Sequence, residues 1–338
     1  MKTSLFHSRS VKGIAAVLAV AACAMVAAPV SAKNLRVTSQ LSPKHPITAN
    51  LIAFKEIVEK ESGGKLTIEI FHSAQLYKDK EVPQAVASGA VDMGTASLTR
   101  FAGTIPAVDM FYVPFLLPSH EAAKTATEKG STIRGPLDGE ILKTGARVLW
   151  WQALGGAIFM SKDKIEKPAD VKGLKVRVFG KTLGKFVEVL GGAPALISGS
   201  EQFLAYQRGT VDAGMSTAAA VKSRKLYEVL NHITITNHAS VWFVVIINEK
   251  VWQSLSKDEQ ALIDKAALQV ETDLRNSIVK KDMDTIAFVR KETKMGVTEQ
   301  SAAQIKAWQD ASKPVVDLYI QSAGPLGAQL VEAAGKLK

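Results

Sequence analysis

A short unit that reads as a helix, a glycine and a strand occurs twice in this chain of 338 residues. Six positions hold the same residue at the same spacing in both copies. They are Glu81, Ala85, Gly89, Val91, Asp92 and Gly94 in the first copy, and Glu201, Ala205, Gly209, Val211, Asp212 and Gly214 in the second. A chance match is one explanation, because G-x-V-D is a common string. We favour the other explanation, a duplicated unit that gives two related α/β lobes. Two facing lobes form a cleft, and such clefts often bind small molecules.

The hydrophobic pattern around both copies alternates between strands and helices. Strands are predicted over residues 35–42, 66–71, 91–96, 147–154, 157–160, 174–179 and 211–215, and helices over 47–61, 80–88, 185–190 and 201–208. This alternation is typical of an α/β fold with a largely parallel sheet. The apolar run over 241–248 is too short to span a bilayer and predicts a buried strand.

The C-terminal part has a different pattern, with almost only helices after residue 256. Ser256 and Glu259 have the spacing of a capping box, and apolar residues then recur at helical spacing along a long helix. Ser301 and Gln304 have the same spacing before another helix. No linker rich in Pro, Gly and Ser separates independent domains. The expected parts of the folded chain are lobe I over 33–152, lobe II over 153–240, and a crossing strand and helices shared by both lobes over 241–338.

The first 32 residues have the features of a secretory signal peptide. Three basic residues precede an apolar run over 13–30, and small residues ending in Ala32 form a cleavage site before Lys33. A membrane anchor is one alternative for this run, and a lipidated Cys23 is the other. Cleavage of residues 1–32 removes the only cysteine and lowers the formal net charge from +10 to +7. The mature protein is then thiol-free and mildly basic, and we expect it in a bacterial periplasm.

Sequence motifs for catalysis, cofactors and metals are missing from the chain. It has no G-x-x-x-x-G-K-[ST] or G-x-G-x-x-G phosphate-binding loop, no G-x-S-x-G elbow and no H-E-x-x-H pair. Its basic residues are spread among acidic ones, so they form no stripe for nucleic acid, although the positive balance suits an anionic small molecule. We therefore expect no enzyme activity, no cofactor, no metal ion and no bound nucleic acid.

Arg177 is the candidate binding residue that the local pattern indicates. Alternation over 174–179 places Arg177 on one face of a strand bounded by apolar residues, so its guanidinium should be partly buried. A buried guanidinium needs an anionic partner. That partner is either an internal carboxylate or the carboxylate of a ligand, which a guanidinium can bind through two parallel hydrogen bonds.

Several strings occur in the order and spacing found in one family of transport proteins. They are Ser73-Ala74-Gln75-Leu76, Gly89-x-Val91-Asp92-Met93, Val113-Pro114-Phe115-Leu116-Leu117, Lys167-Pro168-Ala169-Asp170 with Gly173-Leu174-Lys175-Val176-Arg177, and Arg208-Gly209-Thr210-Val211-Asp212 with Lys225-Leu226-Tyr227-Glu228-Val229. From about residue 35 to about residue 296, the chain resembles the periplasmic solute-binding proteins of tripartite ATP-independent periplasmic (TRAP) transporters, of the DctP type. The resemblance implies a two-lobed, type II-like periplasmic binding protein in which a long helix crosses both lobes.

The resemblance also implies which residues contact the ligand. Arg177 matches the arginine that grips the ligand carboxylate in most relatives, and four further residues match positions of polar contacts. These four residues are Gln40, Asp79, Ser97 and Ser216. A bidentate pair between Arg177 and a carboxylate would orient the anion, and it would strengthen as closure of the lobes excludes water.

Three departures from the family pattern bear on the ligand. Ser216 replaces the asparagine of many sugar-acid binders, Ala157 replaces a possible second arginine, and Gly199 stands where some relatives have an aromatic residue. The loss of a second cation predicts a simpler acid, so a monocarboxylate, a small dicarboxylate and an aromatic acid all fit. The tryptophans expected near this acid, which otherwise fill the core, are Trp150, Trp151 and Trp242.

Together these observations predict a monomeric, non-enzymatic receptor. It would bind a small organic acid by closure of two lobes and deliver it to the membrane permease subunits of a TRAP transporter. A secreted enzyme that uses the same cleft is the first alternative, and the missing catalytic motifs disfavour it. A binding protein for an ABC-type or sensor system is the second, and it differs only in its partner.

Overall fold

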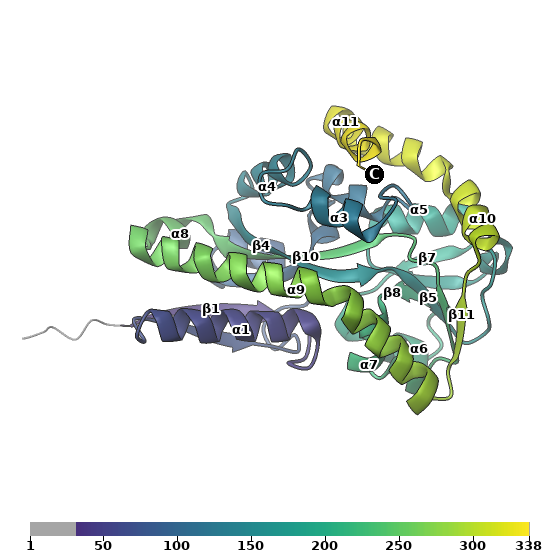
Figure 1. The fold of residues 1–338 in the computed structure, drawn as a ribbon, viewed down its shortest axis with the longest axis horizontal. Helices are drawn as coiled ribbons and strands as arrows, with labels where there is room; N and C mark the ends of the chain where they lie inside the picture. The colour runs from purple at the N-terminus through teal and green to yellow at the C-terminus, as the bar shows by residue number, and fades with distance from the viewer. Residues whose placement is uncertain (1–31, 338) are drawn as a thin grey trace, which may run out of the picture.

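The computed structural model describes residues 32–337, which form two β-sheets surrounded by helices (Figure 1). Apart from Ala32, the predicted signal peptide with its Cys23 lies outside the described residues. The first sheet has the strand order β2-β1-β3-β10-β4. Its strands are β1 (Lys33–Ser39), β2 (Leu66–Phe71), β3 (Met93–Ser97), β4 (Ala146–Gly156) and β10 (Ser240–Asn248). We call this sheet, with the helices around it, lobe I.

The second sheet defines lobe II and has the strand order β11-β9-β5-β8-β6-β7. Its strands are β5 (Ile158–Ser161), β6 (Lys175–Val178), β7 (Ala193–Leu196), β8 (Ala213–Ser216), β9 (His232–Ile235) and β11 (Gly296–Glu299). The prediction of a two-lobed α/β fold is confirmed. The chain passes from the first sheet to the second between Gly156 and Ile158, because β4 continues beyond the expected end of lobe I at residue 152.

The duplicated sequence unit forms equivalent elements in the two lobes. These elements are α2 (Val82–Ala87) followed by β3 in lobe I, and α6 (Gln202–Gln207) followed by β8 in lobe II. Asp92 Oδ2 accepts a hydrogen bond of 2.8 Å from the backbone N–H of Arg36 in β1, which is parallel to β3. Asp212 Oδ2 accepts one of 2.8 Å from the backbone N–H of Lys175 in β6, which is parallel to β8. The repeated aspartate therefore ties each strand to its parallel neighbour.

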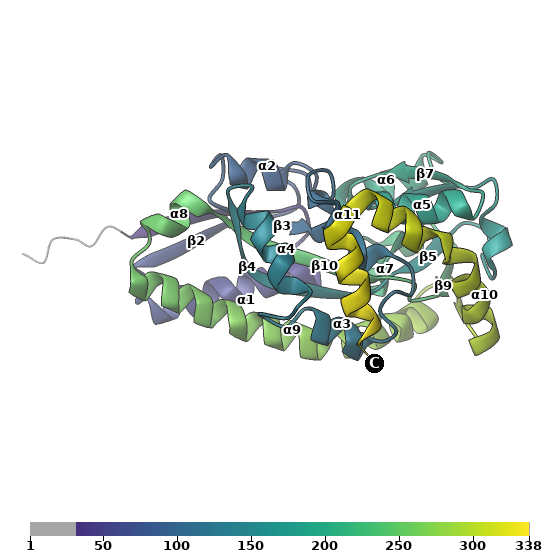
Figure 2. The same ribbon diagram turned by 90° about the horizontal axis from the view of Figure 1, so that it is seen from above.

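Three segments connect the lobes. Strand β4 leads into β5 through Gly155 and Gly156, and β10 runs antiparallel beside β4. The third segment is α9 (Lys257–Glu292), a helix of 36 residues that extends along both lobes (Figures 1 and 2). It packs against α1 (Pro46–Glu61) and β4 in lobe I and against α7 (Ala218–Ser223) and β11 in lobe II. The crossing helix that the family resemblance implied is therefore present.

The other helices cover the sheets and return across the molecule (Figure 2). They are α3 (His120–Ala126), α4 (Arg134–Leu142), α5 (Lys181–Val189), α8 (Glu249–Ser254), α10 (Ala302–Ser312) and α11 (Pro314–Gly335), with the 3-10 helices η1 (Leu98–Phe101), η2 (Pro106–Tyr112), η3 (Pro168–Val171), η4 (Gly199–Glu201) and η5 (Leu226–Glu228). Both predicted capping boxes form, since the Ser256 and Ser301 hydroxyls accept from the backbone N–H groups of Glu259 and Gln304. Within residues 32–337, no helix combines the length and the apolar character needed to cross a membrane.

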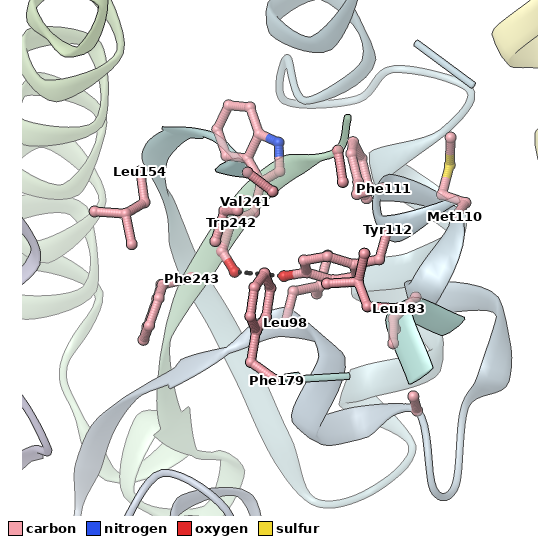
Figure 3. Close-up of a cluster of buried hydrophobic side chains, with 14 of the residues drawn as sticks. Leu98, Met110, Phe111, Tyr112, Leu154, Phe179, Leu183, Val241, Trp242 and Phe243 are labelled. Carbon is pink, nitrogen blue, oxygen red and sulfur yellow. Dashed lines mark hydrogen bonds between the residues drawn. The ribbon is translucent and has the colours of Figure 1, made fainter. Parts of the chain in front are cut away.

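An apolar cluster joins the two lobes (Figure 3). Phe179 and Leu183 of lobe II belong to the same cluster as Leu98 and Tyr112 of lobe I. The rings of Tyr112 and Phe179 meet edge to face with centroids 5.6 Å apart. The Tyr112 hydroxyl also donates a hydrogen bond of 3.0 Å to the backbone carbonyl of Trp242 in β10. The lobes of this structure are therefore in direct contact, which is the closed arrangement.

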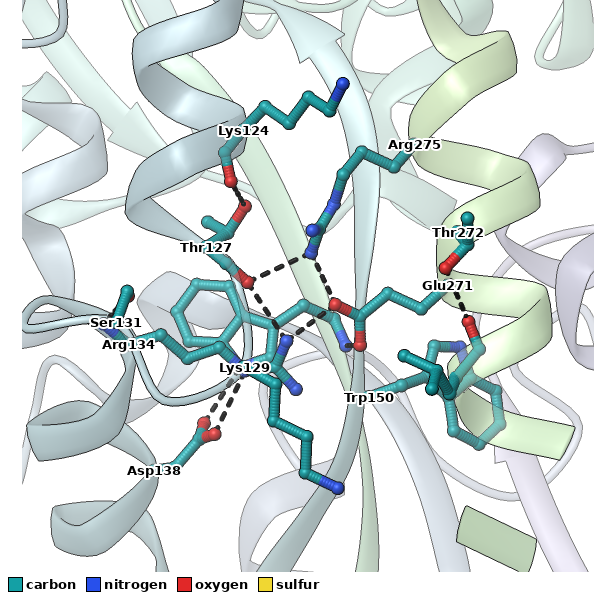
Figure 4. A network of polar contacts seen from close by, with 12 residues as sticks. Lys124, Thr127, Lys129, Ser131, Arg134, Asp138, Trp150, Glu271, Thr272 and Arg275 are labelled. Carbon is teal, nitrogen blue, oxygen red and sulfur yellow. Dashed lines mark hydrogen bonds and ion pairs between the residues drawn. The ribbon is translucent and has the colours of Figure 1, made fainter. Parts of the chain in front are cut away.

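A buried ion-pair network attaches the first half of α9 to lobe I (Figure 4). Arg134 of α4 is 1% exposed, and its Nη1 lies 2.6 Å from Glu271 Oε1. Arg275 contacts the same carboxylate oxygen, and both arginines donate to the carbonyl of Thr127. Asp138 contacts the other edge of Arg134, with 3.1 Å between Nε and Oδ2. Two guanidinium groups are thus neutralised by two carboxylates inside lobe I.

A carboxyl group packs on the crossover between the lobes. Asp282 of α9 lies so close to Gly155 that a Cβ at that position would come within 2.0 Å of Oδ2. Gly155 also has a φ of +96°, which a residue with a side chain rarely adopts. Burial raises the pKa of Asp282 to about 7, although the backbone N–H groups of Gly156 and Ala219 favour its ionised form.

We expect Asp282→Asn to remove a pH dependence from the stability of the protein. An unfolded aspartate has a pKa of about 3.9, so between about pH 4 and pH 7 the folded state holds a proton that the unfolded state has released. The free energy of unfolding of the natural protein should therefore fall by about 2 kcal/mol over this range. This value is smaller than the full pKa shift would give, because the Asp282 side chain is partly exposed to solvent. Urea unfolding between pH 4.5 and pH 8 measures this fall. Asp284→Asn, at an exposed position of the same helix, should retain it, and a retained fall in Asp282→Asn would refute the assignment.

Candidate functional site

A small cavity lies between the two lobes, where the carboxyl ends of parallel strands from both sheets face each other. Its lining comprises Gln40, Asp79, Ser97, Arg177, Phe179, Gly199, Ser216, Arg224, Val241 and Phe243. Gln40 follows β1, Ser97 ends β3 and Ser216 ends β8. Ligands of open α/β sheets bind outside the carboxyl ends of their strands, so the position is typical of a binding site. The five polar residues that the family resemblance implied, Gln40, Asp79, Ser97, Arg177 and Ser216, all line this cavity.

Arg177 is buried at the lobe II side of the cavity, with 2% of its surface exposed. Its Nε donates to the carbonyl of Ile197 at 3.0 Å, and its Nη1 donates to the carbonyl of Met215 at 2.6 Å. The guanidinium carbon lies 5.3 Å from the centre of the Phe179 ring, which holds the side chain from one face. Burial lowers the pKa of Arg177 to about 9. These contacts position the charge, and both of these hydrogen-bond partners are uncharged backbone carbonyls.

The alternative partner for Arg177, an internal carboxylate, is not found in the described part of the chain. No carboxylate oxygen among residues 32–337 lies within the 4.0 Å of an ion pair from its guanidinium. A buried cation without an opposite charge costs free energy, because burial removes its hydration. The geometry therefore supports an external anion as the partner.

Asp79 organises the lobe I side of the cavity. It is fully buried and accepts hydrogen bonds from the backbone N–H of Ser97 at 2.9 Å and from the Ser97 hydroxyl at 2.8 Å. Its second oxygen also forms an ion pair with Arg100, which follows β3 in η1. Asp79 and Arg100 thus neutralise each other. Asp79 fixes Ser97 at the cavity wall, where the serine oxygen can still accept a hydrogen bond.

Two polar contacts connect the lobes at the edge of the cavity. Gln40 Oε1 of lobe I accepts a hydrogen bond of 3.3 Å from the backbone N–H of Ser200 in lobe II. Lys78 of lobe I and Glu201 of lobe II form an exposed ion pair of 2.8 Å. The hydrogen bond from Lys78 holds the pKa of Glu201 below its usual value. Both contacts form only when the lobes are closed, so they stabilise the closed form. The charges of Lys78 and Glu201 stay exposed in it.

Arg224 lines the cavity but was not predicted from the sequence, like the apolar residues Phe179, Val241 and Phe243. It follows α7, and its Nη1 donates to Gln202 Oε1 at 2.6 Å and lies 3.4 Å from the Ser216 hydroxyl. Its buried Nε has no hydrogen-bond partner among the described residues. Burial lowers the pKa of Arg224 to about 10. The expectation that Ala157 leaves the site without a second cation is therefore wrong, because the second cation comes from another element.

The three tryptophans require a correction, because none of them lines either cavity described within residues 32–337. Trp150 packs on Phe54 with ring centres 4.5 Å apart, on the side of α1. Trp151 and Trp242 both pack on Phe111, and Figure 3 shows Trp242 in the same cluster as Phe111. All three are at most 1% exposed, and each indole N–H donates to a protein oxygen. They fill the core instead of forming a pocket wall.

A second and larger cavity, of about 720 Å³, opens between α3, α9 and α10. Its lining includes Asp282 at the crossover and His238, and none of the site residues predicted from the sequence. The cavity between the lobes has only about 20 Å³ in this closed arrangement, which suits one water molecule. A solute can reach Arg177 only if the lobes separate.

Comparisons with known proteins agree with this architecture. Residues 37–322 match the family DctP, bacterial extracellular solute-binding protein, family 7. The chain is 29% identical over 300 residues to the C4-dicarboxylate-binding periplasmic protein DctP of Rhodobacter capsulatus, with 87% of each chain covered. Two solved structures share its fold with a TM-score of 0.85. One is a TRAP periplasmic solute-binding protein from Shewanella oneidensis with bound succinate, at 24% identity, covering 90% of this chain and 98% of that one. The other is DctP7 of Bordetella pertussis, an extracytoplasmic solute receptor binding pyroglutamic acid, at 20% identity, covering 90% of this chain and 100% of that one.

A family match over most of the chain, on a fold whose two lobes enclose a polar cavity, decides the class of the protein. Its members bind solutes outside the cytoplasm and are receptors rather than enzymes. The chain therefore belongs to the DctP family of bacterial extracellular solute-binding proteins, family 7.

Proposed function

We propose that this protein is the periplasmic receptor of a TRAP transporter and that it binds a small organic acid between its two lobes. The observation that carries the proposal is the buried guanidinium of Arg177, which lines the cavity without a carboxylate partner among the described residues. A carboxylate of the solute would supply the missing charge through the guanidinium edge that the backbone carbonyls leave open. Succinate and pyroglutamate, the ligands of the two similar structures, are both carboxylates.

We propose the following order of events. Separated lobes admit the acid, whose carboxylate pairs with Arg177 while Ser97, Ser216 and Gln40 offer polar contacts. Closure then excludes water, which strengthens the ion pair. The Gln40–Ser200 and Lys78–Glu201 contacts form in the same step. The ligand thereby shifts the population toward the closed form, and the permease subunits would recognise this form.

The N-terminal segment supports delivery to the periplasm. Its basic start and apolar run are typical of a signal peptide, and we propose cleavage after Ala32. The first strand of lobe I begins at Lys33, immediately after this site. The mature receptor would act as a monomer, which binds one acid per two-lobed unit.

A thermal-shift screen of organic acids on purified residues 33–338 tests the proposed function. A ligand at about 1,000 times its Kd should stabilise the protein by about 4 kcal/mol, so at least one carboxylate should raise the melting temperature clearly. Amides of the same acids, which lack the negative charge, serve as matched controls and should have no effect. Stabilisation by neutral or cationic solutes, with none by any carboxylate, would overturn the proposal.

A further inference from the structure

The larger cavity, of about 720 Å³, lies at the crossover between the lobes, and we call it the crossover cavity. Gly155 and Gly156 of the crossover line it, together with residues from both lobes, α9 and α10. Its volume falls in the range of about 300–1,000 Å³ that small-molecule sites occupy. None of the described residues that line it also lines the cavity between the lobes. A molecule in the crossover cavity would therefore contact a separate set of residues from the acid of the proposed function.

Acidic side chains supply the charge of the crossover cavity. Asp282 and Glu299 line it, whereas no lysine or arginine does so in the part of the chain that the structure describes. The two histidines of the lining, His120 and His238, add little positive charge at neutral pH, because burial lowers the pKa of both. Glu299 forms an ion pair with Arg290, which compensates its charge. Asp282 has no basic nitrogen within the 4.0 Å of an ion pair among residues 32–337, so its charge is the uncompensated one.

The carboxyl group of Asp282 is held in place and keeps one oxygen without a partner. Oδ2 packs against Gly155, where an added Cβ would lie 2.0 Å from it. The backbone N–H groups of Gly156 and Ala219 favour the ionised form of this carboxyl group. Oδ1 is buried and has no hydrogen-bond partner among the described residues. A buried acceptor without a donor is unfavourable, so a ligand that donates a hydrogen bond to Oδ1 would remove this cost.

Apolar side chains form much of the rest of the lining. Phe111, Phe115 and Ile158 contribute from the interior of the protein. Val279 and Met283 of α9 also line the cavity, and they are 46% and 65% exposed. Exposed apolar side chains that gather at a pocket are typical of a ligand with an apolar body. The crossover cavity thus combines an apolar surface with a single uncompensated negative charge.

We infer that the crossover cavity is a second ligand site, which takes an apolar primary ammonium compound whose charged group pairs with Asp282. The ammonium group supplies a positive charge and N–H donors for Oδ1, and the apolar body covers Val279 and Met283. A carboxylic acid is disfavoured there, because it would place a second negative charge beside Asp282. The receptor would then bind two solutes of opposite charge, an acid between the lobes and an ammonium compound at the crossover.

Calorimetric titrations at pH 8 with matched compounds test the inference. At this pH the amines are protonated, and Asp282, with a pKa of about 7, is mostly ionised. The probes are the phenylalkylamines from 2-phenylethylamine to 4-phenylbutylamine, and alcohols of the same carbon skeleton are their neutral controls. At least one amine should bind at least about 10-fold more tightly than its alcohol, and Asp282→Asn should weaken that amine by about 30-fold or more. Asp284→Asn, at an exposed position of the same helix, should bind it normally.

Two variants at the opening of the cavity test the location of the ammonium group. Met283→Lys adds a positive charge there and Met283→Glu a negative one, and at 65% exposure neither change should disturb the fold. At low ionic strength, the lysine variant should bind the amine at least about threefold more weakly than the glutamate variant. Leu268→Lys, at an exposed apolar position of the same helix outside the cavity, should bind it as the natural protein does.

Binding of the acid provides an independent control. Amine binding should survive in Arg177→Gln, and carboxylate binding should survive in Asp282→Asn, which would also show that this variant is folded. Equal binding of amines and alcohols, no binding of any amine, an unchanged amine affinity in Asp282→Asn or equal affinities in the two Met283 variants would overturn the inference. Loss of amine binding in Arg177→Gln would overturn it as well, because the amine would then lie between the lobes. Each of these results leaves the proposed function standing.

Discussion

Arg177→Gln is expected to weaken carboxylate binding by about 100-fold or more. The reason is that the variant removes the charge which a buried carboxylate needs, and truncation of one partner of a buried charge pair costs about 2–5 kcal/mol. Arg177→Lys should fall between the natural protein and the glutamine variant, because a lysine keeps the charge but loses the planar fork. Calorimetry with the best acid from the thermal-shift screen measures both affinities.

The same substitution should leave the fold intact. Arg177 is buried without a carboxylate partner among residues 32–337, so its removal takes away an unfavourable charge together with two hydrogen bonds to backbone carbonyls. We expect the free energy of unfolding of Arg177→Gln to stay within about 1 kcal/mol of the natural value. Lys175→Gln, at an exposed position of the same strand, is the matched control and should bind normally. An unchanged affinity in Arg177→Gln would show that Arg177 does not bind the ligand.

The position of Arg177 could be predicted because it depends on local pattern. Arg177 lies between apolar residues in the short strand β6. A charged residue in such a position is buried when the strand packs in the sheet. The lobes could be predicted for a similar reason. The repeated aspartates Asp92 and Asp212 perform the same hydrogen bonding in both lobes, so the sequence repeat reflects a structural one.

Arg224 could not be predicted, because its burial depends on residues far away in the sequence. It lies within residues 222–225, three of which are basic, and this pattern resembles a solvated helix face. Only the fold brings Gly199 against its guanidinium. Arg224 lines the cavity, whereas Lys225, which follows it with a φ of 53°, does not.

The prediction that the tryptophans lie near the ligand was wrong for a different physical reason. Trp150 and Trp151 are adjacent in β4, so they point to opposite faces of the first sheet. The sequence does not say what covers each face. In the structure α1 and α9 cover one face and α4 lies on the other, so both indoles are buried in a core. A large aromatic side chain in a strand therefore indicates a pocket only where the face of the sheet that it points to is open.

Glu271→Gln is expected to lower the free energy of unfolding by about 3–5 kcal/mol. Glu271 is 5% exposed and contacts both Arg134 and Arg275, so its neutralisation leaves buried positive charge without enough compensation. Its Oε2 also accepts a hydrogen bond of 3.2 Å from the backbone N–H of Trp151, which joins α9 to β4. Asp138 still pairs with Arg134 in the variant, which places the expected loss toward the lower end of the range. Urea unfolding monitored by circular dichroism measures it.

Two further variants separate a loss of charge balance from a general weakening of α9. Asp284→Asn breaks an exposed ion pair with Lys280 on the same helix and should cost about 0.5 kcal/mol or less. Replacement of Arg134, Glu271 and Arg275 by methionine together with Asp138→Asn, which removes the remaining carboxylate of the network, should recover most of the stability, because no buried charge is then left unpaired. A loss in Glu271→Gln as small as that of Asp284→Asn would mean that water reaches the network and that it does not anchor α9. Since the network shares no residue with the cavity between the lobes, ligand affinity of the folded Glu271→Gln variant should stay unchanged, which distinguishes the anchoring of the crossing helix from the binding of the acid.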